Sequence, residues 1–304
     1  MREIVLHEVG LRDGLQIERA VVPTDVKARW ARRLAESGVD MIQLGSFVHR
    51  EKVPQMADTD ELFGLFRDAG PRPILTGLVL NEKGLERGLA CGVRYFCLGI
   101  SASETHSRKN TGMSIAEAQD RIVKTALAAR AAGAAVQVSV QSAFGCSYEG
   151  EVPEEQVLDI VSRYLDAGLT MISLADTVGH ATPDRVTRLF SRVLQLDAQV
   201  ECACHFHDTY GLGLVNCYAA LEAGVTYFES AFAGLGGCPF TAVTGGNVCT
   251  EDLLHLWHRM GKRTDVSLDP IVDVSRDAAA YFSRELPGKI YKTGPIPPVR
   301  PALG

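Results

Sequence analysis

Two histidines separated by a single residue, His205 and His207, have the spacing in this sequence that most directly suggests chemistry. They end an apolar run over 199–207 that is typical of a β-strand. Side chains on a strand alternate between its two faces, so both imidazoles point the same way and the residues between them point the other way. Two imidazoles placed like this can bind one cation, or they can simply hydrogen-bond within polar surroundings.

Oxygen-bearing side chains follow other apolar runs. Asp13 follows the first run, Asp176 ends another, and Asn247 lies in a glycine-rich segment near the end of the pattern. Imidazole, carboxylate and amide oxygen form a mixed, fairly hard ligand set, which favours Mg²⁺ or Mn²⁺ with open water positions over a closed zinc site. An open position permits Lewis-acid chemistry on a chelating oxygen substrate.

The elements that must position these side chains alternate regularly. Eight strand-like runs are expected at 3–9, 40–46, 73–79, 94–100, 134–142, 170–176, 199–207 and 226–232. Helical patterns are expected at 24–37, 58–69, 82–91, 115–132, 153–167, 183–196, 211–223 and 246–260. Most of the strand runs are apolar on both faces, as buried parallel strands are.

Eight strand–helix units in series predict an α/β protein with a (β/α)8 TIM barrel. The alternative is a doubly wound sheet, which usually carries GxGxxG after its first strand; here that turn reads GLRDG, residues 10–14. We expect one domain over 1–304. Within it, 261–304 forms a C-terminal extension with a helix over 268–284 and an irregular surface segment in the last 18 residues.

In such a barrel the site lies at the C-terminal ends of the strands, which should bring the polar residues found there into one mouth. Besides the residues already named, these are Arg12, Gln16, Gln43, Ser46, His49 and Ser142. Cys238 differs from the other cysteines because it lies in the glycine-rich turn GLGGCPF. A cysteine there can serve as an acid or a nucleophile, or it can have no chemical role.

Composition narrows the class of protein. The net charge is −6 and no basic run is present, so nucleic-acid binding is not expected. Acidic residues occupy the place of a signal-peptide core, and no stretch reaches 18 uninterrupted apolar residues, so no membrane span is expected. The eight cysteines form no CxxC pair. These features predict a reduced, cytoplasmic protein.

At this point several motifs match a known family. The chain resembles the 3-hydroxy-3-methylglutaryl-CoA (HMG-CoA) lyases, within the divalent-metal TIM-barrel lyases and aldolases. The Arg-Asp turn and the HxHD pattern mark the wider group, whereas GLGGCP is more specific to the lyases. The matching stretches are EVGLRDGLQ (8–16), SFV (46–48), VPQMAD (53–58), FGCSYEG (144–150), SLADTVG (173–179), HFHDTYG (205–211), AGLGGCPF (233–240) and GGNVCTEDL (245–253).

The resemblance implies a role for each matching residue. It implies a metal held by Asp13, His205, His207 and Asn247, with Mg²⁺ or Mn²⁺ as the cofactor. Arg12 would face the thioester oxygen of an acyl-CoA substrate, and Asp176 would act as base at its hydroxyl. Cys238 would belong to a loop that closes over the site and supplies a proton-transfer group. His205 would be a catalytic residue as well as a metal ligand. The predicted substrate contacts are Gln16, Gln43, Ser46 and Ser142.

The adenosyl end of the substrate would lie outside the mouth. Candidates for contact with its phosphates are Arg50, Lys52, Arg108 and Lys109, although a solvated surface charge is the more usual interpretation for each of these residues. The family resemblance also suggests a homodimer.

Departures from the family pattern put the substrate in question. The family has Pro where this chain has Leu11 and Ser147, Asn-Glu where it has Ile17-Glu18, and often Ser-Pro-Lys where it has His49-Arg50-Glu51. Its eukaryotic-type members also carry a further cysteine near the C-terminus. It also has Glu where this chain has Gln43. A glutamate there would neutralise Arg12, so glutamine leaves the site one unit more positive. The swap either alters substrate preference or is tolerated as nearly isosteric.

Four hypotheses follow for the activity. The first is retro-Claisen cleavage of HMG-CoA to acetyl-CoA and acetoacetate. The second is a lyase for a related 3-hydroxyacyl-CoA such as citramalyl-CoA, and the third is an aldolase or condensing enzyme of the same group. The fourth is a catalytically silent binding protein, which would be expected to have lost a ligand or Arg12.

Overall fold

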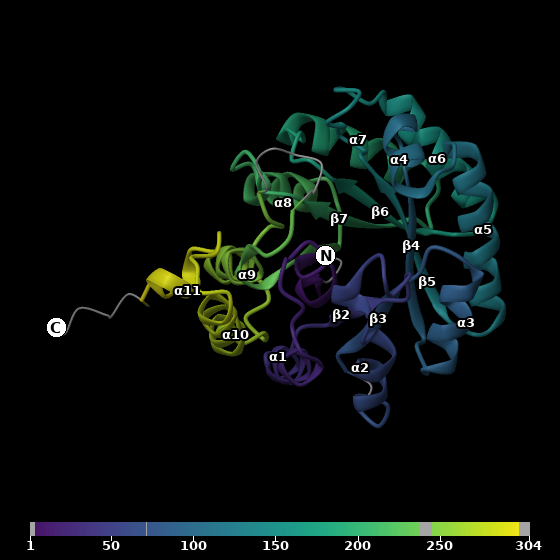
Figure 1. Ribbon diagram of the computed structural model, residues 1–304. Coiled ribbons are helices and arrows are strands. Elements are labelled where there is room, and N and C mark those ends of the chain that lie inside the picture. The colour runs from purple at the N-terminus through teal and green to yellow at the C-terminus, as the bar shows by residue number, and fades with distance from the viewer. Residues whose placement is uncertain (1–3, 71, 238–244, 298–304) are drawn as a thin grey trace.

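Eight parallel strands close into a barrel in the computed structural model, which describes residues 4–70, 72–237 and 245–297 (Figure 1). Each strand pairs with its neighbours in chain order, and β1 closes the barrel against β8. The predicted (β/α)8 TIM barrel is confirmed. Its strands are β1 (Val5–Glu8), β2 (Met41–Ser46), β3 (Ile74–Leu78), β4 (Tyr95–Ser101), β5 (Ala135–Gln141), β6 (Met171–Asp176), β7 (Glu201–Phe206) and β8 (Tyr227–Ser230).

Helices surround the barrel between successive strands (Figure 1). Sequence-local signals fix several of their ends. Ser114 and Glu117 form a capping box at the start of α5, and Gly133, at a φ of +79°, ends it. The barrel helices are α1 (Thr24–Glu36), α2 (Thr59–Leu65), α3 (Glu82–Ala90), α4 (Glu104–Thr111), α5 (Ile115–Ala131), α6 (Glu154–Asp166), α7 (Pro183–Leu196), α8 (Gly213–Glu222) and α9 (Thr250–Arg259).

Two helices were not expected. The first, α4, has the polar sequence ETHSRKNT, so no apolar period marks it; the Ser103 side chain caps it by accepting a hydrogen bond from the His106 N–H. The second, α11 (Ile290–Thr293), lies in the segment expected to be irregular. That expectation is wrong for these residues, because Tyr291 is buried and its hydroxyl accepts the Leu286 N–H.

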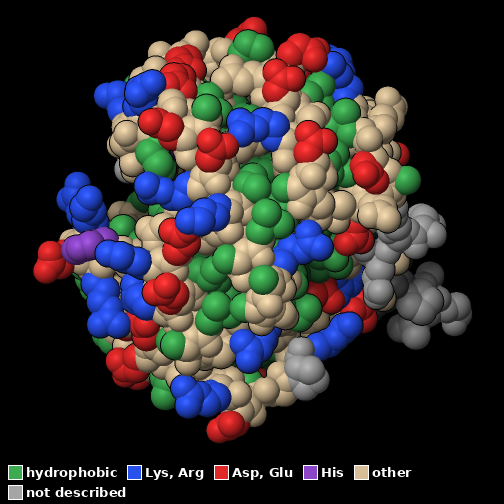
Figure 2. All heavy atoms as spheres, turned by 90° about the vertical axis from the view of Figure 1, so that its right-hand side faces the viewer, with side chains coloured by type: hydrophobic (Ala, Val, Ile, Leu, Met, Phe, Trp, Pro, Cys, Tyr) green, Lys and Arg blue, Asp and Glu red, His purple; other side chains and the backbone are tan. Residues whose placement is uncertain are grey.

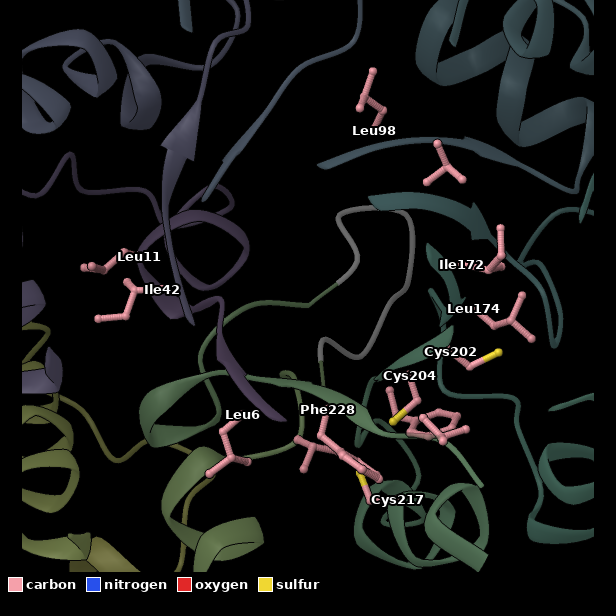
Figure 3. Close-up of a cluster of buried hydrophobic side chains, with 14 of the residues drawn as sticks. Leu6, Leu11, Ile42, Leu98, Ile172, Leu174, Cys202, Cys204, Cys217 and Phe228 are labelled. Atoms are coloured by element: carbon pink, nitrogen blue, oxygen red, sulfur yellow. The ribbon is translucent and has the colours of Figure 1, made fainter. Parts of the chain in front are cut away.

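The hydrophobic core lies between the barrel and its helices. Side chains that point outward from the strands pack there, among them Leu6, Ile172, Leu174, Cys204 and Phe228 (Figure 3). Cys202, Cys204 and Phe206 of β7 belong to this core, as the alternation pattern predicted. The inward-pointing side chains of the same strands include His205 and Glu229, so the barrel interior is polar near its mouth.

The C-terminal extension packs against the barrel through α10 (Leu268–Tyr281), which lies beside α1 and the short turn Phe232–Gly234 after β8. The Ala233 N–H bonds to Ser275 Oγ at 3.0 Å, and the Gly288 N–H donates to the Ala233 carbonyl at 3.1 Å. Ala233 has a φ of +57°, a conformation that costs energy for a residue with a Cβ. The extension therefore helps to hold this strained turn.

Charged side chains are distributed without a single-sign patch on the face shown in Figure 2, where basic and acidic groups are intermixed. Ion pairs such as Arg163–Asp120 (2.7 Å) and Lys124–Glu82 (2.6 Å) join neighbouring helices. Within the described part of the chain, no helix combines the length and apolar character needed to cross a bilayer.

Candidate active site

The turn after β1 brings two charged side chains to the barrel mouth. Gly10–Gly14 forms a single wide helical turn in which the N–H groups of Arg12, Asp13 and Gly14 all donate to the Val9 carbonyl. Gly10 has no room for a side chain, since a Cβ there would lie 2.5 Å from the Phe232 ring. The glycine therefore lets the chain turn tightly beneath the site.

Asp13 meets the two histidines of β7. Its Oδ2 lies 3.8 Å from His205 Nε2 and 3.7 Å from His207 Nε2, and the two imidazole nitrogens are 3.3 Å apart. All three side chains are buried. Each residue offers one ligand atom, and these three atoms lie within 4.8 Å of one another, close enough to bind one metal ion together.

Asn247 completes this group. Its Nδ2 donates to Asp13 Oδ2 at 2.9 Å and to the Leu235 carbonyl at 2.9 Å. Its Oδ1 is buried and has no hydrogen-bond partner among the described residues. A buried amide oxygen without a partner is costly unless something else satisfies it. An orphaned amide oxygen beside a carboxylate and two imidazoles fits a divalent cation with mixed oxygen and nitrogen ligands.

Charges in this cluster are strongly coupled. Burial opposes ionisation of Asp13, but the Arg12 guanidinium and the nearby imidazoles outweigh it and hold the carboxyl pKa well below its usual range. Burial lowers the pKa of His205, but the bonds and charges of Glu229 and Asp13 outweigh it, so that the pKa is raised overall. In the absence of a cation, a proton on His205 would balance the surrounding carboxylates.

Arg12 lies between the ligand cluster and β2. Its Nε donates to Gln43 Oε1, and one terminal nitrogen contacts Asp13 Oδ1 at 2.5 Å. Gln43 thus lies beside Arg12, as expected from the sequence. Asp13 is the only carboxylate in these two contacts of Arg12, and it also faces His205 and His207.

A cavity of about 350 Å³ opens over these groups. Its charged lining among the described residues consists of Arg12, Asp13 and Glu229. With both imidazoles neutral, a divalent ion would change the net charge of these three groups from one negative to one positive unit, which suits an anionic ligand. The predicted site residues that line the cavity are Arg12, Asp13, Gln16, Gln43, Ser46, His205 and His207.

Three described residues among the predicted site residues do not line the cavity: Asn247, which contacts Asp13, and Asp176 and Ser142. Both Asp176 oxygens accept backbone N–H groups, from His180 at 2.8 Å and Ala181 at 3.0 Å, and the side chain does not line the cavity. Ser142 also lies outside the lining and has a φ of +55°. Asp176 is on the same outward face of β6 as Leu174, whereas Ser142 follows the last residue of β5. Their roles at the mouth stay predictions. Cys238 lies outside the described residues.

A second cavity, of about 420 Å³, adjoins the first, and Asn110 and Gln141 line both. Lys52 lines it, whereas the other three phosphate candidates are engaged on the surface. Arg50 pairs with Asp60 at 2.8 Å and Arg108 with Glu104 at 2.7 Å. The Lys109 ammonium lies 4.8 Å from the centre of the Tyr148 ring.

Sequence reasoning missed several polar groups inside the barrel. Glu229 accepts a hydrogen bond from His205 Nδ1 at 2.8 Å and another from Gln137 Nε2. His7 and Thr76 share a hydrogen bond of 2.8 Å. His106, from the unpredicted α4, lines the cavity. The alternation of strand side chains that identified the β7 histidines also places Gln137 on the inner face of β5. The position of Gln137 could therefore have been predicted from the sequence.

The fold and the site together define a class: TIM-barrel enzymes whose mouth carries a carboxylate–imidazole cluster beside a buried arginine. The family model described as HMGL-like matches residues 3–278. The chain belongs to this family, and its relatives are lyases.

The relatives span nearly the whole chain. Hydroxymethylglutaryl-CoA lyase YngG of Bacillus subtilis is 34% identical over 289 residues, covering 95% of this chain and 96% of that protein. (R)-citramalyl-CoA lyase of Chloroflexus aurantiacus is also 34% identical, over 98% of this chain and 97% of that one. An HMG-CoA lyase from Acinetobacter baumannii, solved in complex with coenzyme A and 3-methylmalate, superimposes with a TM-score of 0.90 at 36% identity, covering 98% of this chain and 97% of that chain.

Proposed function

We propose that this protein is a metal-dependent acyl-CoA lyase that cleaves HMG-CoA into acetyl-CoA and acetoacetate. The observation that carries the proposal is the contact of Arg12 with Asp13, the carboxylate that also faces both β7 histidines. One cavity thus offers a cation-binding cluster and a fixed positive charge side by side. A 3-hydroxyacyl thioester with a distal carboxylate presents oxygen atoms for both.

Asp13, His205, His207 and Asn247 would hold Mg²⁺ or Mn²⁺. When bound, the divalent ion supplies a Lewis acid that makes the substrate hydroxyl more acidic. The short distances between Asp13 and the imidazoles, and the orphaned Oδ1 of Asn247, support this ligand set.

Arg12 has the role of stabilising developing charge. Loss of the hydroxyl proton and cleavage of the carbon–carbon bond leave the ketone of acetoacetate and the enolate of acetyl-CoA. Negative charge then accumulates on the thioester oxygen, where a fixed guanidinium stabilises the transition state more than the ground state. Arginine suits this position because it stays protonated.

We assign the base role to Asp176, as the family resemblance implies. Burial raises the pKa of this carboxyl, which makes it a stronger base once it is ionised. To reach the substrate, one oxygen must give up its bond to His180 or Ala181. Asp176→Asn tests the role, because it keeps the size of the side chain and removes the base; wild-type kcat in this variant would exclude Asp176. Proton delivery by Cys238 rests on the resemblance alone.

The second cavity offers room for the coenzyme A arm. Asn110 and Gln141 line both cavities, so a ligand can extend from one into the other, and Lys52 lines the second one. The coenzyme A named in the Acinetobacter complex supports an acyl-CoA ligand for this chain.

Citramalyl-CoA is the second candidate substrate. A citramalyl-CoA lyase is as similar to this chain as the Bacillus HMG-CoA lyase, and Gln43 removes a carboxylate that the HMG-CoA lyase pattern carries beside Arg12. No comparable observation favours an aldolase, a condensing enzyme or a silent binding protein. The homodimer and the cytoplasmic location stay predictions.

One assay separates the candidates. Purified protein loaded with Mn²⁺ is incubated with HMG-CoA or with citramalyl-CoA, and release of acetyl-CoA is measured for each. We expect turnover of HMG-CoA with the larger kcat/KM. Turnover of citramalyl-CoA alone would transfer the assignment to that substrate, and turnover of neither would overturn the proposal.

A further inference from the structure

A buried carboxylate, Glu229, lies inside the barrel beside His205, and the reaction described above does not use it. From its contacts we infer that Glu229 is a positioning residue that fixes the orientation and tautomer of His205 and thereby strengthens metal binding. This inference rests on the proposed metal site.

Strand register places Glu229 between two histidines. It is paired with His205 of β7 on one side and with His7 of β1 on the other. Neighbouring residues at the same level of parallel strands point to the same face, so all three side chains extend into the barrel interior. Glu229 is 6% exposed and His7 is fully buried, so water does not compete for the hydrogen bonds of these side chains.

The contacts of Glu229 are unequal. Its Oε2 accepts the His205 Nδ1–H at 2.8 Å, and Gln137 Nε2 donates to Oε1 from β5. His7 Nδ1 lies 3.9 Å from Oε1, beyond hydrogen-bond distance. Glu229 therefore bonds directly to one proposed ligand and is itself held in place by Gln137.

This arrangement fixes which nitrogen of His205 can bind a metal. With the proton of the neutral ring held on Nδ1 by a carboxylate, the lone pair is on Nε2, the atom that faces Asp13 and His207. A carboxylate acceptor also makes the imidazole a stronger ligand, and losing such a partner typically weakens metal binding ~10- to 100-fold.

His207 provides the contrast. Its Nδ1 is buried and has no hydrogen-bond partner among the described residues. The two imidazoles are thus supported differently, although they lie on the same strand and their Nε2 atoms are 3.3 Å apart. Glu229 makes His205 the better oriented of the pair.

The inference is tested by Mn²⁺ binding to the substrate-free protein, measured by titration calorimetry. Glu229→Gln keeps the size of the side chain and removes its charge, and we expect the Kd to rise ~10- to 100-fold. Gln137→Leu, which frees Glu229 without touching His205, should raise the Kd by a smaller factor. His7→Leu is the matched control: it alters the other neighbour of Glu229, and we expect its Kd to stay within about threefold of wild type.

A second readout reports the tautomer itself. In ¹⁵N spectra of histidine-labelled protein at alkaline pH, wild type should show His205 protonated on Nδ1, and Glu229→Gln should show a mixture of tautomers. Wild-type Mn²⁺ affinity in folded Glu229→Gln would overturn the inference, and so would an equal loss in His7→Leu. Should Glu229→Gln fail to fold, an unchanged Kd in Gln137→Leu would overturn it. If wild type itself bound no Mn²⁺, the proposed metal site would fail instead.

Discussion

The two walls of the cavity differ in charge. One wall is formed by β7, β8, β1 and the residues that follow β7 and β1, and it carries the histidine pair, Glu229, Asp13 and Arg12. The facing wall is formed by β4, α4 and β5, and it carries uncharged groups. These are Cys97, His106, Asn110, Gln137, Ser139 and Gln141. Burial lowers the pKa of His106, which keeps that imidazole neutral near pH 7.

The difference in charge assigns stabilisation of the reaction to one wall and selection of the ligand to the other. Charge that develops during bond cleavage needs ions close to it, and those are concentrated on one wall. A neutral wall can select a ligand through shape and hydrogen bonds without disturbing these charges. Gln137 connects the two, because it reaches from β5 to the Glu229 carboxylate. Variants on either wall can therefore test whether the division holds.

The largest effect is expected from loss of the metal. Asp13 Oδ2 faces both imidazoles, so Asp13→Asn should abolish tight Mn²⁺ binding and lower kcat by ~10³-fold or more, since Lewis-acid stabilisation is worth several kcal/mol. Chelation of wild type should have the same effect and be reversed by added Mn²⁺. Ser139→Ala on the facing wall serves as the control. Full activity in the chelated enzyme would contradict the metal assignment.

Arg12→Met should come next. It removes the guanidinium beside Asp13 and should lower kcat ~10²- to 10³-fold, as loss of a transition-state donor does. Mn²⁺ should still bind at least as tightly as in wild type, because Arg12 is no ligand and its positive charge no longer repels the cation. Steady-state kinetics and calorimetry measure the two quantities. A variant with wild-type kcat would show that the role given to Arg12 is wrong.

Metal binding should depend on pH. Because the pKa of His205 is raised, its proton persists to a higher pH than in free histidine and must leave before the metal binds. The Kd for Mn²⁺ should therefore rise ~10-fold per unit as pH falls below this pKa, and level off above it. Calorimetry between pH 5.5 and 8.5 measures this. A flat profile would argue against competition between the proton and the metal.

Gln43→Glu should have the smallest effect. It adds a carboxylate beside Arg12 and should shift the ratio of kcat/KM for HMG-CoA over citramalyl-CoA ~10-fold, equivalent to about 1.4 kcal/mol. Gln141→Glu adds the same charge to the facing wall and should change the ratio by less than about threefold. An unchanged ratio in Gln43→Glu would favour the interpretation that glutamine is merely tolerated there.

The sequence predicted the barrel well because its signal is periodic. Eight apolar runs alternate with amphipathic segments, and each run became a strand. The alternation rule also placed His205 and His207 together on the inner face. Applied to β6, the same rule groups Asp176 with Leu174 on the outer face, and the sequence-based expectation for Asp176 did not use it. Ser142 follows the last residue of β5 and has a φ of +55°, so the rule does not extend to it.

Other features lacked a readable signal. Glu229 is one acidic residue in the aromatic run TYFESAF, and nothing in that run shows that it meets His205, because the pairing of β7 with β8 decides it. Helix α4 is short and polar, and its first turn depends on a cap from Ser103. The contact of Glu229 with His205 joins distant segments, which periodicity within one segment does not record. The Ser103 cap is local, but the helix that follows it has no apolar period.

The anchoring of the Ala233 turn by the C-terminal extension has a consequence for biosynthesis. A ribosome releases the chain from its N-terminus, so all eight strands emerge before Ser275, Arg284 and Gly288. Until then the turn that precedes Asn247 lacks its bonds to Ser275 and Gly288, and Glu18, in the loop after the Arg12–Asp13 turn, lacks its ion pair with Arg284 at 2.6 Å. A nascent chain can close its barrel early, but the Ala233 turn and Glu18 gain these contacts only when the last helices have emerged.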